Sequence, residues 1–444
     1  MRAPRKASGP VRVVLAFGAI AGLCGTLLGC GSSSSTALKT GKLTVTVSAP
    51  AGVSPSVTVT GPAGYRQVIT GTKTLTGLAA GSYTIVAAPV VIPAAIVGTA
   101  YDGAISGNPA SVTASSTAAA SVTYGLRPGS GGLWVVNYVH SATAVEYSAQ
   151  QLAASTSGAP ATALATGVSG DFGAAFDAEG NLWVGQTGFG DAIVEYSASQ
   201  LGSSGAPAPA VTLKPSAAGS LNGVAGLAFD ANGNLWVANS LANTIVEFAA
   251  DQLTSSGSPT PAVTLSASGG SLSAPTGVAF DAGNNLWVVN AGDSSAVEFT
   301  PGQYAATGAP VPAVTLTSNA GSLRGPLGLA FDRSGDLWVS DGNTAADIVV
   351  EFLASQLSAS GSPLPAVTLA ANGTSLNIPL GLAFDESGNL WVANLGVPPS
   401  VVEFAASQLV TSGSPLPNVA ITGSSLTGPA GIAFAPPAAN LPLK

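Results

Sequence analysis

Apolar and polar residues alternate in short runs along most of this chain, and glycine, proline and serine separate the runs. Runs with a period of two between turn residues predict β-strands. One run recurs: the triplet Leu-Trp-Val appears six times, at intervals of 49, 53, 51, 51 and 53 residues, and it contains every tryptophan of the chain. A regular period of about 50 residues is typical of the blades of a β-propeller.

Each repeat holds four apolar runs, which predict the four strands of one blade. In the third repeat they lie within 226–230, 233–239, 245–248 and 261–265. An Asp-x-x-Gly-Asn segment joins the first two runs and predicts a tight hairpin, in which the aspartate binds backbone amides. We therefore interpret the recurring aspartates as structural: Asp177, Asp230, Asp281, Asp332 and Asp385.

The ends of the repeat region are complementary. The first tryptophan run, at 132–137, has no Gly-x-Ala-Phe strand before it, whereas 431–434 supplies such a strand after the sixth repeat. An innermost strand from the C-terminal end would complete the first blade and leave no strand edge exposed. The sequence thus predicts an all-β fold with a six-bladed β-propeller at 131–436, closed by a C-terminal innermost strand and followed by a tail at 437–444.

A separate β region precedes the repeats at 42–126. It contains strictly alternating runs such as 43–47 and 56–60, which predict a small β-sandwich. Residues 78–85, Leu-Ala-Ala-Gly-Ser-Tyr-Thr-Ile, resemble a hairpin of carboxypeptidase-regulatory-like and other Ig-like modules. The resemblance implies a spacer domain.

The N-terminal 29 residues have the pattern of a secretory signal, with four cations before residue 13 and an apolar run from 13 to 28. Those apolar residues would reach about 24 Å as a helix, less than the roughly 30 Å hydrocarbon core of a membrane. Leu27-Leu28-Gly29-Cys30 resembles the lipobox of bacterial lipoproteins. The resemblance implies cleavage before Cys30, lipidation of Cys30 and, because Gly31 follows, an outer-membrane anchor in the bacterial cell envelope. An ordinary cleaved signal with an incidental cysteine is the alternative.

Residues 30–41 then form a serine-rich tether. The net charge limits which classes of molecule this chain can bind. The chain has 13 Lys and Arg residues and 21 Asp and Glu residues. Loss of the four cations of the signal would leave nine cations and 21 acids, a net charge of −12. Nucleic acid is excluded as a partner on this ground. Only Cys24 and Cys30 are present, so the mature chain can form no internal disulfide. We expect a monomer.

The units Gly-Leu-Ala-Phe-Asp, Gly-Asn-Leu-Trp-Val-Ala-Asn and Ile-Val-Glu-Phe resemble NHL-type propeller repeats and their streptogramin-lyase-like relatives, over about 131–434. The unit here is longer, because a Gln-Leu and Ser-Gly-x-Pro insertion separates its third and fourth strands. Streptogramin-type lyases use a histidine base and a metal. This chain contains one histidine, His140. The resemblance therefore implies the fold of these lyases more strongly than their activity.

A polar residue follows each tryptophan by three positions, where the second strand ends. In a closed ring these side chains would approach the mouth of the central channel, where their oxygens would suit Ca²⁺ or Mg²⁺, or a polyhydroxylated ligand. The alternative is that Asn and Asp end strands because they favour turns. The candidate channel-mouth binding residues are Asn137, His140, Gln186, Asn239, Asn290, Asp341 and Asn394, and nearby loops add Asp171, Phe189, Asp191, Asp293, Arg324 and Asp347.

Glutamate and glutamine also recur in every repeat, five residues apart. Because an active site is needed only once, we expect the glutamates to bind backbone or a neighbouring blade. They are Glu146, Glu195, Glu247, Glu298, Glu351 and Glu403.

Two functions remain. The first is a lipid-anchored binding or scaffold module for a protein, glycan or envelope partner, with no catalytic residue. The alternative is a metal-dependent lyase or lactonase at the channel mouth, with His140 or Asp341 as base.

Overall fold

The computed structural model describes residues 40–92, 99–126, 131–138, 142–167, 170–188, 190–216, 220–266, 269–319, 321–342 and 347–435. Their ordered elements are β-strands and a few single-turn helices, so the predicted all-β class is confirmed. None of the helices in these ranges has the length and apolar character needed to cross a membrane. Cys30 and the tail at 437–444 lie outside the described residues.

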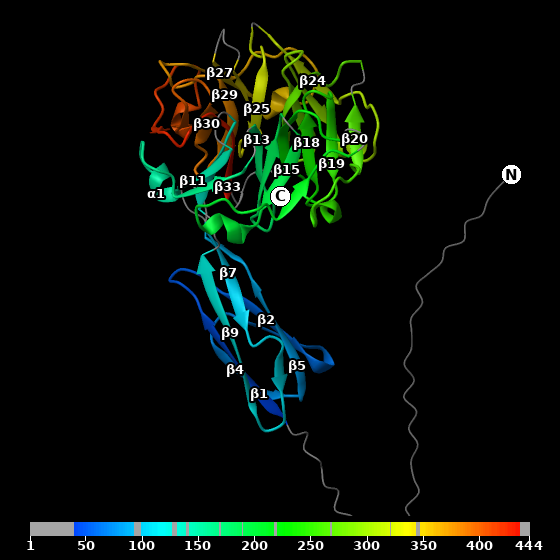
Figure 1. Ribbon diagram of the computed structural model, residues 1–444, viewed down its shortest axis with the longest axis vertical. Helices are drawn as coiled ribbons and strands as arrows, with labels where there is room; N and C mark the ends of the chain where they lie inside the picture. Colours follow the sequence, from blue (N-terminus) through cyan, green and yellow to red (C-terminus); the bar gives the residue numbers. More distant parts are fainter. Residues whose placement is uncertain are drawn as a thin grey trace, which may run out of the picture.

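Two sheets form the N-terminal part, which Figure 1 shows in blue and cyan as an elongated body beside the repeats. One sheet has the order β4-β1-β9-β7-β6 and the other β3-β2-β5-β8. The strands are β1 (Gly41–Ser48), β2 (Ser56–Gly61), β3 (Tyr65–Ile69), β4 (Lys73–Leu78), β5 (Gly81–Ala88), β6 (Val90–Ile92), β7 (Thr99–Ser106), β8 (Ala110–Val112) and β9 (Thr117–Leu126).

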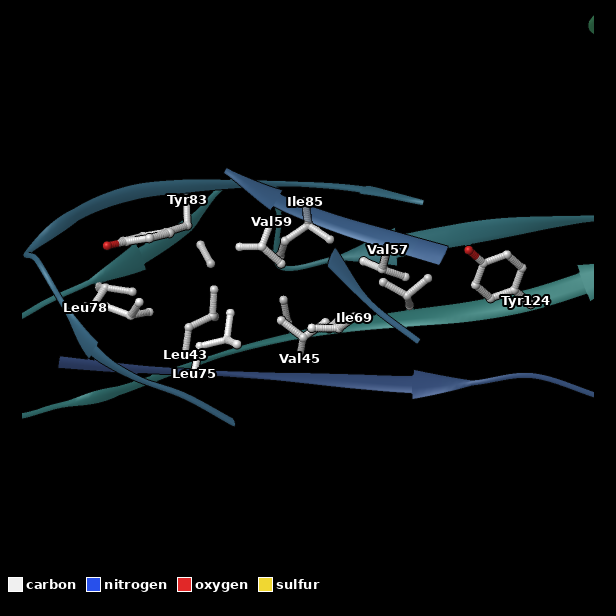
Figure 2. Packing of buried hydrophobic residues seen from close by; sticks show 14 of the residues in the cluster. Leu43, Val45, Val57, Val59, Ile69, Leu75, Leu78, Tyr83, Ile85 and Tyr124 are labelled. Atoms are coloured by element: carbon white, nitrogen blue, oxygen red, sulfur yellow. The ribbon is translucent and has the colours of Figure 1, made fainter. Parts of the chain in front are cut away.

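Alternate side chains of these strands fill the space between the two sheets, as period-two patterning requires. Figure 2 shows Leu43 and Val45 of β1 facing Val57 and Val59 of β2, and all four are fully buried. Tyr124 of β9 accepts a hydrogen bond from the Ser56 amide at 3.3 Å and donates one to the Ala88 carbonyl at 3.0 Å. The apolar core and this tyrosine thus join the two sheets.

Residues 131–435 form repeated four-stranded antiparallel sheets, six of them among the described residues. The innermost strands are β13 (Asp171–Phe176), β17 (Val224–Phe229), β21 (Pro275–Phe280), β25 (Pro326–Phe331), β29 (Pro379–Phe384) and β33 (Pro429–Ala435). The second strands, which carry the tryptophans, are β10 (Gly132–Asn137), β14 (Leu182–Gln186), β18 (Leu235–Asn239), β22 (Leu286–Asn290), β26 (Leu337–Asp341) and β30 (Leu390–Asn394). The third strands are β11 (Thr143–Ser148), β15 (Ala192–Tyr196), β19 (Thr244–Phe248), β23 (Ser295–Phe299), β27 (Ile348–Phe352) and β31 (Ser400–Phe404). The outermost strands are β12 (Thr162–Ala165), β16 (Val211–Leu213), β20 (Val263–Ser266), β24 (Val314–Thr317), β28 (Val367–Ala370) and β32 (Val419–Ile421).

The first sheet takes its innermost strand from the C-terminal end, since β33 pairs antiparallel with β10. Innermost strands contact one another in sequence, and β33 contacts both β29 and β13. A glycine in each strand permits the approach: a Cβ on Gly431 would lie 2.6 Å from the Phe172 carbonyl oxygen, and one on Gly328 would lie 2.2 Å from that of Leu380. Any larger residue would therefore push neighbouring strands apart.

A tryptophan and an aspartate fix each hairpin between the first and second strands. In the third repeat the Trp236 indole donates to Asp230 Oδ2 at 3.3 Å, while Asp230 Oδ1 accepts the amides of Asn232 and Asn234. The indole also packs edge-on against Phe280 of the next repeat, at 6.1 Å between ring centroids. These contacts confirm the structural interpretation of the aspartate.

The insertion between the third and fourth strands crosses to the preceding sheet. In the second repeat, Gly205 pairs with Leu164 of β12, and Ser204 Oγ accepts the Ala163 amide at 3.0 Å. The same pairing recurs around the repeats and ends with Thr156 of the first repeat beside Ile421 of β32. The insertion thus covers the outer edge of the neighbouring sheet, which would otherwise be open to pairing with another chain.

Each insertion begins with a single helical turn that the recurring glutamine holds. Gln200 Oε1 accepts the Ser197 amide at 2.8 Å, and its Nε2 donates to the Ala208 carbonyl at 2.7 Å. The turns are α1 (Ala149–Leu152), η2 (Ala198–Gly202), η3 (Ala250–Leu253), α2 (Pro301–Tyr304), η4 (Ala354–Gln356) and η5 (Ala406–Gln408), and η1 (Pro62–Gly64) lies in the N-terminal part.

Candidate functional site

The polar residues that end the second strands are buried and bind the segment leading into their own innermost strand. Asn239 is 0% exposed, accepts the Asn222 amide at 3.3 Å and donates to the Ser220 carbonyl at 2.9 Å. Asn137, Asn290 and Asn394 are also 0% exposed and make the same pair of backbone bonds. A ligand that bound these amides would have to replace those bonds.

The two remaining members of the predicted ring are buried as well. Gln186 donates to Asp171 Oδ1 at 2.9 Å, and the Thr166 hydroxyl donates to the other oxygen of the same carboxyl. Burial raises the pKa of Asp171 to about 6, although both hydrogen bonds act to lower it. Asp341 is 0% exposed and accepts the Arg324 amide.

Other polar residues on the loops at this end tie one repeat to the next. Asp191 accepts the Gly223 amide at 2.9 Å, and Asp347 accepts the Ile378 amide at 2.9 Å. Asp293 accepts the Ser295 hydroxyl at 2.7 Å within its own repeat. His140 and Phe189 lie outside the described residues.

Two small cavities lie along the innermost strands, of about 180 Å³ where those strands end and about 110 Å³ where they begin. None of the described ring residues lines either cavity. Their walls are mainly Gly, Ala, Val, Leu and Phe, and Thr276 uses its hydroxyl to donate to the Pro326 carbonyl at 2.9 Å. In the described part of the chain, neither cavity presents a titratable side chain.

Apolar side chains, by contrast, reach solvent from the connections between second and third strands. We call the surface formed by these connections the mouth face. Leu241 is 72% exposed and Val397 is 88% exposed. Tyr138 is 37% exposed and packs edge-on against Phe172, which borders the smaller cavity, at 5.7 Å between ring centroids.

The recurring glutamates lie on the third strands, opposite the tryptophans. We expected these glutamates to bind backbone or a neighbouring repeat. For the two glutamates that accept a hydrogen bond, this expectation is wrong. Glu146 accepts the Thr162 hydroxyl at 2.7 Å, and Glu403 accepts the Asn418 amide group at 2.8 Å, both within the same repeat. The carboxylates of Glu195, Glu247, Glu298 and Glu351 accept no hydrogen bond from the described residues.

Sequence reasoning missed one departure from the repeat. The hairpin position occupied by asparagine elsewhere is Asp336 in the fifth repeat, and its carboxylate lies near those of Asp332 and Glu351. Burial, with repulsion from Asp336 and Asp332, raises the pKa of Glu351 to about 7. The signal was visible as Asp-x-x-Gly-Asp in place of Asp-x-x-Gly-Asn.

No protein-family model and no curated protein matches the chain. Solved structures do: the chain is similar to virginiamycin B lyase from Staphylococcus aureus, with 14% identity, 55% of this chain and 75% of that chain covered, and a TM-score of 0.34. It is similar to the nidogen/laminin complex, with 15% identity, coverages of 68% and 97%, and a TM-score of 0.46. A protein of unknown function from Bacteroides caccae gives 12% identity, coverages of 65% and 97%, and a TM-score of 0.42.

Proposed function

We propose that this chain is a binding module of the cell envelope, in which a closed six-bladed β-propeller holds a protein partner on its mouth face. One contrast carries the proposal. The polar residues that end the second strands form hydrogen bonds within the protein, whereas Leu241 and Val397 expose 72% and 88% of their surfaces. These two apolar side chains, one in the third repeat and one in the sixth, offer contact points for a protein surface.

The N-terminal region supports display of this module at a membrane. A lipid on Cys30 would hold the chain, and the tether at 30–41 with the Ig-like spacer would separate the propeller from the bilayer. The insertions cover the outermost strand of each of the six sheets, which favours a monomer.

Lyase or lactonase chemistry at the mouth receives no support from the described residues. A general base needs a lone pair within reach of a substrate. Asp341 is 0% exposed and accepts the Arg324 amide, and neither axial cavity is lined by a titratable side chain of the described residues. We therefore propose only the binding function.

The test compares two exposed apolar positions at the mouth with one elsewhere. Leu241→Asp and Val397→Asp place a charge on the mouth face, and Leu364→Asp does so on an insertion, where the side chain is 62% exposed. After chemical cross-linking in cells, the two mouth variants should lose a complex that Leu364→Asp retains. Equal recovery from all three variants would contradict the proposal. For the anchor, Cys30→Ser should release the chain from membranes, and persistent membrane association would refute lipidation.

A further inference from the structure

The hairpins of four repeats share an arrangement that the fifth repeat lacks. An asparagine donates its Nδ2 to the hairpin aspartate, as Asn234 does to Asp230 at 2.9 Å and Asn285 to Asp281 at 2.9 Å. Asn181 and Asn389 do the same. Asp336 cannot donate this bond, so the fifth hairpin places a second carboxylate where the others place an amide.

Three carboxylates converge as a result. One oxygen each from Asp332, Asp336 and Glu351 lies within 4.8 Å of the other two. Asp332 is fixed, because its Oδ1 accepts the Ser334 and Asp336 amides and its Oδ2 accepts the Trp338 indole at 3.3 Å. Asp336 Oδ1 accepts the Ala354 amide at 2.7 Å, which holds that carboxylate as well. The backbone thus orients two of the three ligands in advance.

Glu351 supplies the observation that points to a ligand. Its side chain is only 8% exposed, yet its carboxylate accepts no hydrogen bond from the part of the chain that the structure describes. The side chain lines a cavity of about 490 Å³ together with Asp332 and Asp336. Glu195, Glu247 and Glu298 are buried to the same extent and also lack a donor among the described residues, but Glu351 alone has two further carboxylates within 4.8 Å, a repulsion that a bound cation would remove. Arg333 lines the same cavity but forms no ion pair with the cluster among the described residues.

We propose that Asp332, Asp336 and Glu351 bind a divalent cation, Ca²⁺, in this cavity. Carboxylate oxygens are its preferred ligands, and two oxygens that bind one Ca²⁺ at about 2.4 Å lie no more than about 5 Å apart. The cavity leaves room for the waters that complete a coordination shell of six to eight oxygens. Mg²⁺ requires a regular octahedron at shorter distances, which fits fixed backbone-held carboxylates less well.

The site is independent of the mouth face, because hairpins and second-strand ends lie at opposite ends of each sheet. Its cavity is lined by the fifth repeat and also by Phe384, Gly388 and Ala406 of the sixth. A bound cation would remove the repulsion at this junction and stabilise the two repeats together.

Terbium luminescence tests the proposal in the mature full-length chain. Trp338 donates to Asp332 and so lies close enough to sensitise Tb³⁺ in the cluster. Wild-type protein should show saturable Tb³⁺ luminescence that Ca²⁺ displaces, with a Kd for Ca²⁺ in the range of roughly 10⁻⁴ to 10⁻³ M. Asp336→Asn restores the hairpin of the other repeats, so it should fold and raise that Kd at least about tenfold.

The fourth repeat offers the reciprocal variant. Asn285→Asp would place a third carboxylate beside Asp281 and Glu298, which line a similar cavity. This variant should gain a second equivalent of Ca²⁺ in calorimetric titration. The proposal is overturned if wild-type protein shows no saturable, Ca²⁺-displaceable signal, or if Asp336→Asn keeps the wild-type Kd.

Discussion

The backbone amide of Ala420 donates a hydrogen bond to Ser155 Oγ at 3.0 Å, across 265 positions of the chain. Thr156, the next residue, pairs with Ile421 in the outermost strand of the last sheet. At the inner edge, β33 of the C-terminal end pairs with β10 of the first sheet. The two ends of the repeat region are therefore joined at both the inner and the outer edge, and cooperative stability should depend on both joints.

Gly431→Ala tests the inner joint. The added Cβ would lie 2.6 Å from the Phe172 carbonyl oxygen, so the neighbouring strand must move. We expect a loss of about 1 to 3 kcal/mol in the free energy of unfolding, measured by denaturant titration. Gly302→Ala is the control, because its Cβ would meet nothing within 4 Å. Equal stability of both variants would contradict the close approach of β33 and β13.

Asp385→Ala tests the hairpin hydrogen bonds. The carboxylate is 0% exposed and accepts the Ser387 and Asn389 amides, the Asn389 side chain and the Trp391 indole. Its removal leaves a buried indole without an acceptor, which should cost roughly 2 to 4 kcal/mol in thermal or denaturant unfolding. Asp251→Ala, on an exposed turn, should change stability by less than about 0.5 kcal/mol. Similar losses in both variants would argue against a special role for the hairpin aspartate.

Asp171 should make stability depend on pH. Burial raises its pKa in the folded chain to about 6 from 3.8, so between these values the folded state binds a proton that the unfolded state has lost. The contribution of this residue to the free energy of unfolding is therefore highest below about pH 4 and falls as pH rises through 6, by about 3 kcal/mol. Asp171→Asn should remove that decline in urea titrations across this range. An unchanged pH profile would show that Asp171 is charged in the folded chain.

Asp336→Asn should stabilise the protein when a chelator removes divalent cations. The substitution relieves carboxylate repulsion and supplies the amide donor that Asn285 provides in the fourth repeat. We expect a gain of about 0.5 to 1.5 kcal/mol in chelator, and a smaller gain or a loss in excess Ca²⁺. A variant less stable than wild type in both solutions would mean that Asp336 has a structural role that asparagine cannot fill.

Much of the fold could be predicted because the same pattern of apolar and turn residues recurs six times in the sequence. The pairing of β33 with β10 followed from a first repeat that lacks a strand and a last segment that supplies one. The role of the insertion could not be predicted, because Gly205 finds its partner Leu164 in the preceding sheet. Only the arrangement of adjacent sheets determines which edge that glycine covers.

The candidate site was less predictable for a different reason. An asparagine at a strand end can face a channel or bind its own backbone, and Asn239 binds backbone through both polar atoms of its side chain. Asp336 was visible as a departure from the repeat, yet Glu351 lies 15 positions later. Their proximity depends on the antiparallel pairing of β26 with β27, where Trp338 lies opposite Glu351.

We infer that the mouth face is the surface of the repeat region that binds the partner. A photoreactive amino acid is placed at Leu241, on the mouth face, and in a second variant at Ala231, in the hairpin at the opposite end of the same sheet. Both positions are exposed and belong to the third repeat. After irradiation of cells, position 241 should give a discrete cross-linked species that position 231 does not. Cross-linking from position 231 with equal yield, or the absence of a species from position 241, would contradict the account.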